Sequence, residues 1–277
     1  MTAAAQHTDV RALESLLAFW REAGVDACYE DEPVDRTWRP PPARATSPPR
    51  AQSAAPAGAP QSLAATAAPD VAAAIAEARR LAAAAQDLEA LAAAIADFEG
   101  CPLSTQGARQ SVFARGDPRA PVVVIGEGPG AEEDQQGAPF VGRAGKLLDR
   151  MLEAAGVQDR VFITNTVFWR PPGNRTPSFT EQAVCAPFLE RVLQLIRPRL
   201  LLLVGGASAK FLLKKDEGIL SLRGRWFEWR SETSDLVLPA LPTLHPAFLL
   251  RQPAAKKKAW ADLLTLSERL DRPERPA

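Results

Sequence analysis

The stretch PVVVIGEGPG, residues 121–130, decides the fold class of this chain. Residues 122–125 are consecutive β-branched apolar residues, a pattern typical of a strand buried on both faces of a parallel sheet. The glycines and the proline that follow predict a tight loop at the carboxyl end of that strand, where open α/β folds place their ligands. The stretch therefore predicts a parallel sheet and the position of an active-site loop.

Strand and helix patterns alternate along the chain after this loop. Such alternation predicts a doubly wound sheet with helices on both faces. We therefore expect an α/β fold, a three-layer αβα domain around a central, mostly parallel four-stranded sheet whose strands end at one edge. The expected strands are 121–126, 161–165, 199–204 and 238–244, and the expected helices are 143–155, 179–196, 206–213 and 255–270.

The N-terminal part of the chain differs in composition from the rest. Residues 10–24 have the apolar spacing of an amphipathic helix, a candidate for binding a protein partner. Residues 38–69 are rich in Pro, Ala and Ser, which predicts a disordered linker. The alanine-rich stretch 70–97 predicts one long helix capped by Asp70. The expected segments are a helical one at 1–37, the linker at 38–69, the main domain at 70–270 and a tail at 271–277.

Composition limits the class of protein. The 277 residues carry no net charge, but residues 1–100 hold 8 Lys and Arg against 14 Asp and Glu, so the remainder is basic. A mildly basic domain suits a polyanionic partner such as nucleic acid. No apolar run spans a bilayer and the N-terminus lacks a signal pattern, so we expect a cytoplasmic monomer without membrane contact. The three cysteines, Cys28, Cys101 and Cys185, are too widely spaced for a disulfide framework.

Each expected strand-to-helix loop carries a different polar group. Glu127 and Glu133 follow the first strand, Asn165 ends the second, and His245 follows the last. Phe140, in a Pro-Phe-Val-Gly turn, adds an aromatic ring. Carboxylate, amide, imidazole and ring are the groups needed to hold a planar base extracted from DNA and to cut it from its sugar.

These motifs resemble the family 4 uracil-DNA glycosylases. The resemblance covers about residues 97–266 and rests, in order, on GEGPG, PFVGRAGKLLDRML, FITNTVFWRPPGNRTP, CAPFLERVLQLIRP and HPAFLLR. It implies a monofunctional hydrolase that cuts the N-glycosidic bond of uracil in DNA and so initiates base excision repair. The transition state is oxocarbenium-like, with positive charge on the sugar and negative charge on the departing uracil.

The resemblance implies three catalytic residues. Glu127 and Glu133 would stabilise the sugar cation or orient the attacking water, although a charge at a helix N-terminus explains Glu133 equally well. His245 would hydrogen-bond the uracil O2 as negative charge builds, the alternative being a buried structural histidine.

The resemblance also implies contacts to the base. Gly128 would line the uracil site, and Phe140 would stack on the flipped base, unless its ring is simply part of the core. The Asn165 amide both donates and accepts, which matches O4 and N3–H of uracil, whereas cytosine presents the reverse pattern.

Uracil-containing DNA would then contact the rim of the site. Phe248, Leu249 and Leu250 are expected to supply an apolar wedge for the duplex, with some of them facing the core. Each rim cation is a phosphate contact or an ordinary surface charge. These cations are Arg143, Lys146, Arg170, Arg175 and Arg251.

The chain departs from the family at its cofactor. Members usually hold a [4Fe–4S] cluster through four cysteines, of which Cys101 and Cys185 match, whereas Phe98 and Trp169 stand where the other two thiolates belong. Because two thiolates do not normally hold such a cluster, we expect no metal and no cofactor. We expect the two aromatic side chains to fill the vacated volume as an apolar plug.

Two other interpretations stay open. A relative that binds DNA but is catalytically silent, or has altered specificity, would keep the pocket. A nucleotide-binding module would use GEGPG as a phosphate loop, but the chain has neither a GK[ST] ending nor G-x-G-x-x-G spacing there.

Overall fold

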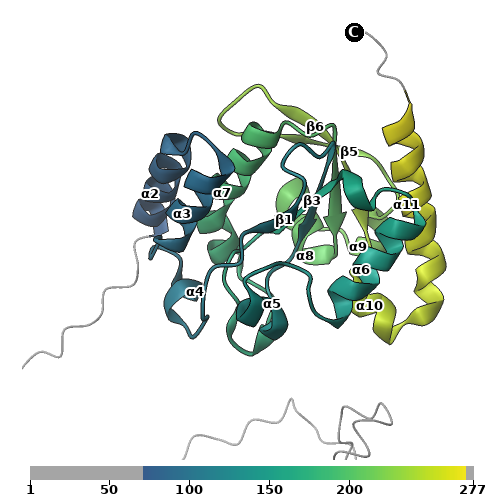
Figure 1. The fold of residues 1–277 in the computed structure, drawn as a ribbon, viewed down its shortest axis with the longest axis horizontal. Helices are drawn as coiled ribbons and strands as arrows, with labels where there is room; N and C mark the ends of the chain where they lie inside the picture. Colours follow the sequence, from purple (N-terminus) through teal and green to yellow (C-terminus); the bar gives the residue numbers. More distant parts are fainter. Residues whose placement is uncertain (1–70, 273–277) are drawn as a thin grey trace, which may run out of the picture. The chain divides into compact units, whose positions relative to one another are not determined.

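Six strands form one sheet between two helical layers in the computed structural model, which describes residues 71–272 (Figure 1). The three-layer αβα fold predicted from the sequence is confirmed. The predicted helical segment at 1–37, the linker at 38–69 and the tail beyond residue 272 lie outside the described residues. Within residues 71–272, no helix is both long enough and apolar enough to cross a membrane.

The four predicted strands form the parallel centre of the sheet. The strand order is β1-β3-β2-β4-β6-β5, in which β3, β2, β4 and β6 run parallel to one another. Strands β2, β3 and β4 are buried at every position, which is the environment that their continuous apolar sequences require. Their bounds are β2 (Val122–Gly126), β3 (Val161–Asn165), β4 (Leu200–Val204) and β6 (Val237–Thr243).

The sheet has six strands rather than the expected four because an antiparallel strand lies at each edge. Strand β1 (Ala114–Gly116) pairs with β3, and β5 (Phe227–Arg230) forms a hairpin with β6. Both are short and only partly buried, so neither produces the continuous apolar run that marks a central strand.

Helices cover both faces of the sheet and enclose two apolar cores. One core lies under α2 (Val71–Ala84), α3 (Leu88–Ala96), α7 (Phe179–Ile196) and α8 (Gly206–Leu213). The other lies under α6 (Arg143–Ala154) and α11 (Lys256–Asp271). The shorter helices are α4 (Pro102–Thr105), α5 (Ala131–Gln136), α9 (Ile219–Leu222), α10 (Pro246–Arg251) and the 3₁₀ turns Gln158–Arg160, Pro172–Asn174 and Pro253–Ala255.

The single helix expected at 70–97 is wrong, since the structure divides it into α2 and α3. The carboxylate of Asp87 accepts a hydrogen bond from the Ala90 N–H at 2.8 Å and so begins a new helix. The break lets Leu91 and Ile95 reach the core beside α7, where both are fully buried.

Candidate active site

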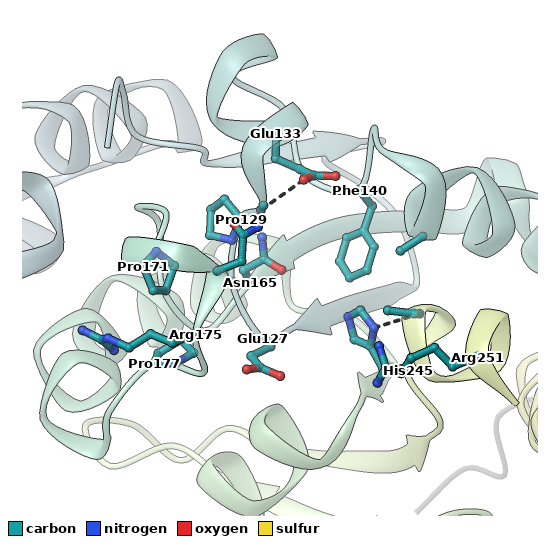
Figure 2. Close-up of a pocket in the computed structure, with 15 residues that line it drawn as sticks. Glu127, Pro129, Glu133, Phe140, Asn165, Pro171, Arg175, Pro177, His245 and Arg251 are labelled. Atoms are coloured by element: carbon teal, nitrogen blue, oxygen red, sulfur yellow. Dashed lines mark hydrogen bonds between the residues drawn. The ribbon is translucent and has the colours of Figure 1, made fainter. Parts of the chain in front are cut away.

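A cavity of about 410 Å³ opens at the carboxyl ends of β2, β3 and β6 (Figure 2). Parallel register places Gly126 beside Asn165, so the first two loops begin side by side. Arg143 and Leu249 are not among the lining residues. The predicted residues that do line the cavity are Glu127, Gly128, Glu133, Phe140, Asn165, Arg175, His245 and Arg251.

Asn165 carries an unpaired buried oxygen at the end of β3. The side chain is 1% exposed, and its Oδ1 is the one buried side-chain oxygen or nitrogen without a hydrogen-bond partner in the part of the chain that the structure describes. A buried acceptor left unpaired costs about 1–3 kcal/mol. A ligand with an N–H group at this point would remove that cost.

Gly126 makes room for this amide. A Cβ at this position would lie 2.4 Å from Asn165 Oδ1 and 2.4 Å from Cζ of Phe140. Only glycine lets the amide and the ring approach the same strand end so closely.

Phe140 has an unusual backbone conformation for a bulky residue. Its φ is 54°, in the left-handed region, which costs about 1–3 kcal/mol when the surroundings impose it. The Arg115 side chain donates hydrogen bonds to the carbonyl oxygens of Pro139, at 2.8 Å, and Phe140, at 3.2 Å. The ring lies 5.9 Å from that of His245, inclined by 31°. The strained turn therefore places an aromatic ring at the wall of the cavity.

The Glu133 carboxylate ties the first loop to this turn. It accepts a hydrogen bond from the backbone N–H group of Gly130 at 3.0 Å (Figure 2). It also accepts from the backbone N–H groups of Val141 at 3.0 Å and Gly142 at 2.9 Å. Both oxygens are engaged, so the geometry favours a role in holding the loop over direct contact with substrate.

Glu127 has a fixed backbone and an available carboxylate. Its carbonyl oxygen accepts a hydrogen bond of 2.6 Å from Thr166 Oγ1, which in turn accepts one of 3.0 Å from Gln182 Nε2. Within residues 71–272, no hydrogen bond or ion pair engages its carboxylate, which lies in the cavity (Figure 2). This carboxylate is therefore available to a water molecule or a sugar.

His245 is held as a neutral hydrogen-bond donor. It caps α10, and its Nδ1 accepts a hydrogen bond from the Ala247 N–H at 3.1 Å, which leaves the proton on Nε2. Burial, and then the charge of Arg251, lower the pKa of His245 to about 4, against the opposing effect of Glu133. The imidazole is therefore uncharged near neutral pH and presents an Nε2–H group.

Residues 113–264 match the family model of the uracil DNA glycosylase superfamily. The chain belongs to this superfamily. It is 37% identical over 171 residues to the Type-4 uracil-DNA glycosylase of Sulfurisphaera tokodaii, covering 60% of this chain and 77% of that protein. It is 36% identical over 182 residues to the Type-4 enzyme of Pyrobaculum aerophilum, covering 64% and 91%, respectively. The Type-4 enzyme of Thermotoga maritima is 39% identical over 153 residues, covering 54% and 77%.

Two residues that were predicted to contact DNA, Leu249 and Arg175, are engaged within the protein in this superfamily member. Leu249 is fully buried and packs with Leu244 and Ala259, so it is the core-facing member of the predicted wedge, whereas Phe248 and Leu250 are half-buried. The sequence of the short helix α10 did not indicate which of its residues face the core. The Arg175 guanidinium is already bound to Glu181 through two hydrogen bonds, of 2.8 Å and 2.6 Å, which limits its use for phosphate.

The other rim cations are less constrained. Arg251 is exposed and lines the cavity, whereas Arg143 and Lys146 are exposed on α6 outside the lining. Arg170 is the exception, because it donates to the Asn174 side chain at 2.7 Å and forms an ion pair with the buried Asp134 at 4.0 Å. These cations remain predicted phosphate contacts.

The four positions of the expected cluster do not fit a [4Fe–4S] group in this glycosylase. The thiols of Cys101 and Cys185 lie 3.8 Å apart and are fully buried. Phe98 and Trp169 are 4% and 3% exposed, and their ring centroids are 6.4 Å apart. Burial raises the pKa of the Cys185 thiol, which favours its protonated form. No group of three or more metal-ligating side chains occurs among the described residues.

Sequence reasoning missed one wall of the cavity. Pro171, Asn174 and Pro177 line it, all from the segment RPPGNRTP. The signal was present in the Gly-Asn pair, because Gly173 and Asn174 both have positive φ, a conformation that these two residue types favour.

Proposed function

We propose that this superfamily member is a uracil-DNA glycosylase, which hydrolyses the N-glycosidic bond of uracil flipped out of DNA and so initiates base excision repair. The unpaired Oδ1 of Asn165 is the observation that carries the proposal. It lies at the end of β3 in a cavity that also contains an aromatic ring, a neutral imidazole and an available carboxylate.

The cavity is complementary to one edge of uracil. Asn165 Oδ1 accepts from the uracil N3–H and its Nδ2 donates to O4. Cytosine presents an acceptor at N3 and a donor at C4, so it would leave the buried amide oxygen unpaired, at a cost of about 1–3 kcal/mol. Phe140 packs against the face of the base.

Each charge of the transition state lies beside a group that stabilises it. His245 Nε2–H donates to O2 of the departing uracil, which leaves with the electrons of the glycosidic bond. The Glu127 carboxylate stabilises the positive sugar and orients the water whose oxygen bonds to the anomeric carbon. Glu133 acts indirectly, by holding the loop and the turn that carries Phe140.

We also propose that the enzyme works without an iron–sulfur cluster. Phe98 lies 5.1 Å from Phe188, and Trp169 lies 6.3 Å from Phe168, centroid to centroid, so the rings form one aromatic cluster beside the two cysteines. This packing supplies the structural support that a cluster would give. Iron near four atoms per chain, with visible charge-transfer absorption, would contradict this proposal.

Three further predictions concern the molecule in the cell. We expect a monomer, a cytoplasmic location and a protein partner for the N-terminal segment 1–37. Uracil-containing DNA is the proposed substrate.

Excision of uracil from a synthetic oligonucleotide tests the function. We expect turnover by the wild-type protein, loss of about 10²–10⁴-fold in Glu127→Ala, and wild-type activity in Glu153→Ala, which removes an exposed carboxylate from α6. Asn165→Asp should also lose activity on uracil. Tight DNA binding without turnover would favour the silent relative instead.

A further inference from the structure

A second cavity, of about 760 Å³, lies between α2, α7, α8 and β5. We call it the α7–α8 groove. Its lining combines apolar and basic side chains, and no step of the proposed reaction uses it. The lining residues that matter here are Phe179 of α7, Lys210 and Phe211 of α8, Lys215, and Arg79 of α2.

Phe179 is unusually exposed for a large apolar residue. It is 75% exposed, more than any other large hydrophobic side chain within residues 71–272. Its ring meets that of Phe211 edge-on, with centroids 5.7 Å apart and an interplanar angle of 66°. Most of the Phe179 ring therefore remains available to stack on a partner.

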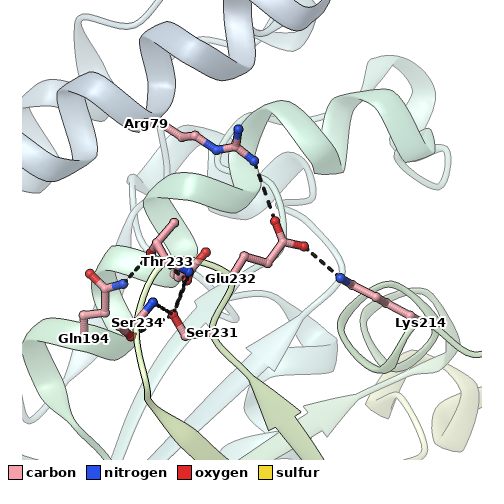
Figure 3. Close-up of polar contacts among 8 residues, drawn as sticks. Arg79, Gln194, Lys214, Ser231, Glu232, Thr233 and Ser234 are labelled. Carbon is pink, nitrogen blue, oxygen red and sulfur yellow. Dashed lines mark hydrogen bonds and ion pairs between the residues drawn. The ribbon is translucent and has the colours of Figure 1, made fainter.

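Cations outnumber carboxylates in the lining of the groove, which favours an anionic partner: Arg79, Lys210, Lys214, Lys215 and Arg230 against Glu190, Asp216 and Glu232. Glu232, on the loop between β5 and β6, forms ion pairs with Arg79 at 3.7 Å and Lys214 at 2.8 Å (Figure 3). Across the described part of the chain, no ion pair engages Lys210 or Lys215, and both are exposed. These two ammonium groups are therefore available to phosphates.

The carboxylate of Glu190 keeps its negative charge, but hydrogen bonds fix its Oε1 against the loop between β5 and β6. It accepts hydrogen bonds from the backbone N–H of Thr233 at 2.9 Å and from its hydroxyl at 2.8 Å. The same carboxylate accepts from Ser231, so the loop between β5 and β6 occupies it.

The groove begins where the active-site cavity ends. Arg175 and Pro177 line the active-site cavity, whereas Thr176 and Phe179 line the groove. On the loop after β4, a Cβ on Gly205 would lie 3.2 Å from the His245 side chain, and Ala207, two residues later, lines the groove. A strand with its target base in the cavity can therefore continue into the groove.

We propose that the α7–α8 groove binds an unpaired flank of the uracil-containing strand, with a base stacked on Phe179 and phosphates near Lys210 and Lys215. An aromatic ring can stack in this way only on a base that is not already stacked in a duplex. The proposal rests on the proposed function, because the target base must occupy the neighbouring cavity.

Substrates with long and short flanks distinguish a role of the groove in binding DNA from a general effect of the substitution on folding. We would measure kcat and KM on single-stranded oligonucleotides with one uracil and either long flanks or one nucleotide on each side. Phe179→Ala should raise KM at least about fivefold on the long substrate and leave the short one unchanged, because stacking on one base is lost. Phe179→Trp should restore KM. Leu264→Ala, which removes an exposed apolar residue from α11, is the control and should match wild type.

Three outcomes would overturn the proposal. The first is that Phe179→Ala leaves KM for the long substrate unchanged, and the second is that it raises KM equally for both lengths. The third is that it raises KM for a fully paired duplex as much as for the single strand. If wild type excises no uracil at all, the proposed function fails instead. The affinity of uracil-free single-stranded DNA for wild type and Phe179→Ala, by fluorescence anisotropy, then tests the groove alone, and equal affinities would exclude it.

Discussion

At the residue scale, His245 links the chemistry of the site to pH. Its pKa is about 4 in the folded protein, below the usual value of about 6.5 for an unfolded chain. The unfolded state therefore binds a proton at a higher pH than the folded state does. The contribution of this residue to the free energy of unfolding is therefore fully present above about pH 6.5 and is lost as the pH falls toward about 4.

Urea unfolding of wild type and His245→Gln between pH 7.5 and about 4.5 measures this contribution. We expect the stability advantage of wild type to shrink by about 2–3 kcal/mol across this range, because only wild type must keep a partly buried imidazole neutral. The N-terminal His7 is present in both proteins and cancels. Parallel loss of stability in the two proteins would contradict the low pKa of His245.

At the scale of elements, Glu133 and Glu127 have separable roles. Glu133→Ala removes three hydrogen bonds that join the loop after β2 to the turn before α6, whereas Glu127→Ala removes no bond seen within residues 71–272. We expect Glu133→Ala to lower both the free energy of unfolding, by about 2 kcal/mol or more, and kcat/KM. We expect Glu127→Ala to lower kcat and to leave KM and the free energy of unfolding unchanged. Chemical denaturation and steady-state kinetics on the same samples check both, and a fully stable Glu133→Ala with lost activity would instead indicate a catalytic carboxylate.

At the scale of the whole molecule, the aromatic cluster joins the helical layer to the sheet. Trp169→Ala should lower the free energy of unfolding by about 3–5 kcal/mol, because the side chain is 3% exposed and leaves a cavity. Trp260→Ala is the matched control, since that tryptophan is 39% exposed on α11, and it should cost roughly 1 kcal/mol or less. Denaturant titrations give both values. Similar losses in the two variants would show that Trp169 is not a packing element.

Much of the fold was predictable because its signals are local. Runs such as residues 122–125 mark central strands wherever they occur, and alternation with helices implies a parallel sheet. The edge strands β1 and β5 were not predicted because a short, half-buried segment at the edge of a sheet needs only to pair with one neighbour and carries no continuous apolar run. The break between α2 and α3 was missed because Asp87 is tolerated in a helix but favoured at a cap.

The sequence by itself determined the parallel core, the glycine-rich loop at the end of β2 and the gathering of Glu127, Asn165 and His245 at one edge. These follow from side-chain periodicity and from the rule that parallel strands end together. Only the tertiary structure decided that Asn165 keeps an unpaired oxygen, that Arg175 is bound to Glu181 and that Leu249 faces the core. Each of these depends on how a side chain packs and which partner it meets in three dimensions, which neither residue type nor spacing specifies.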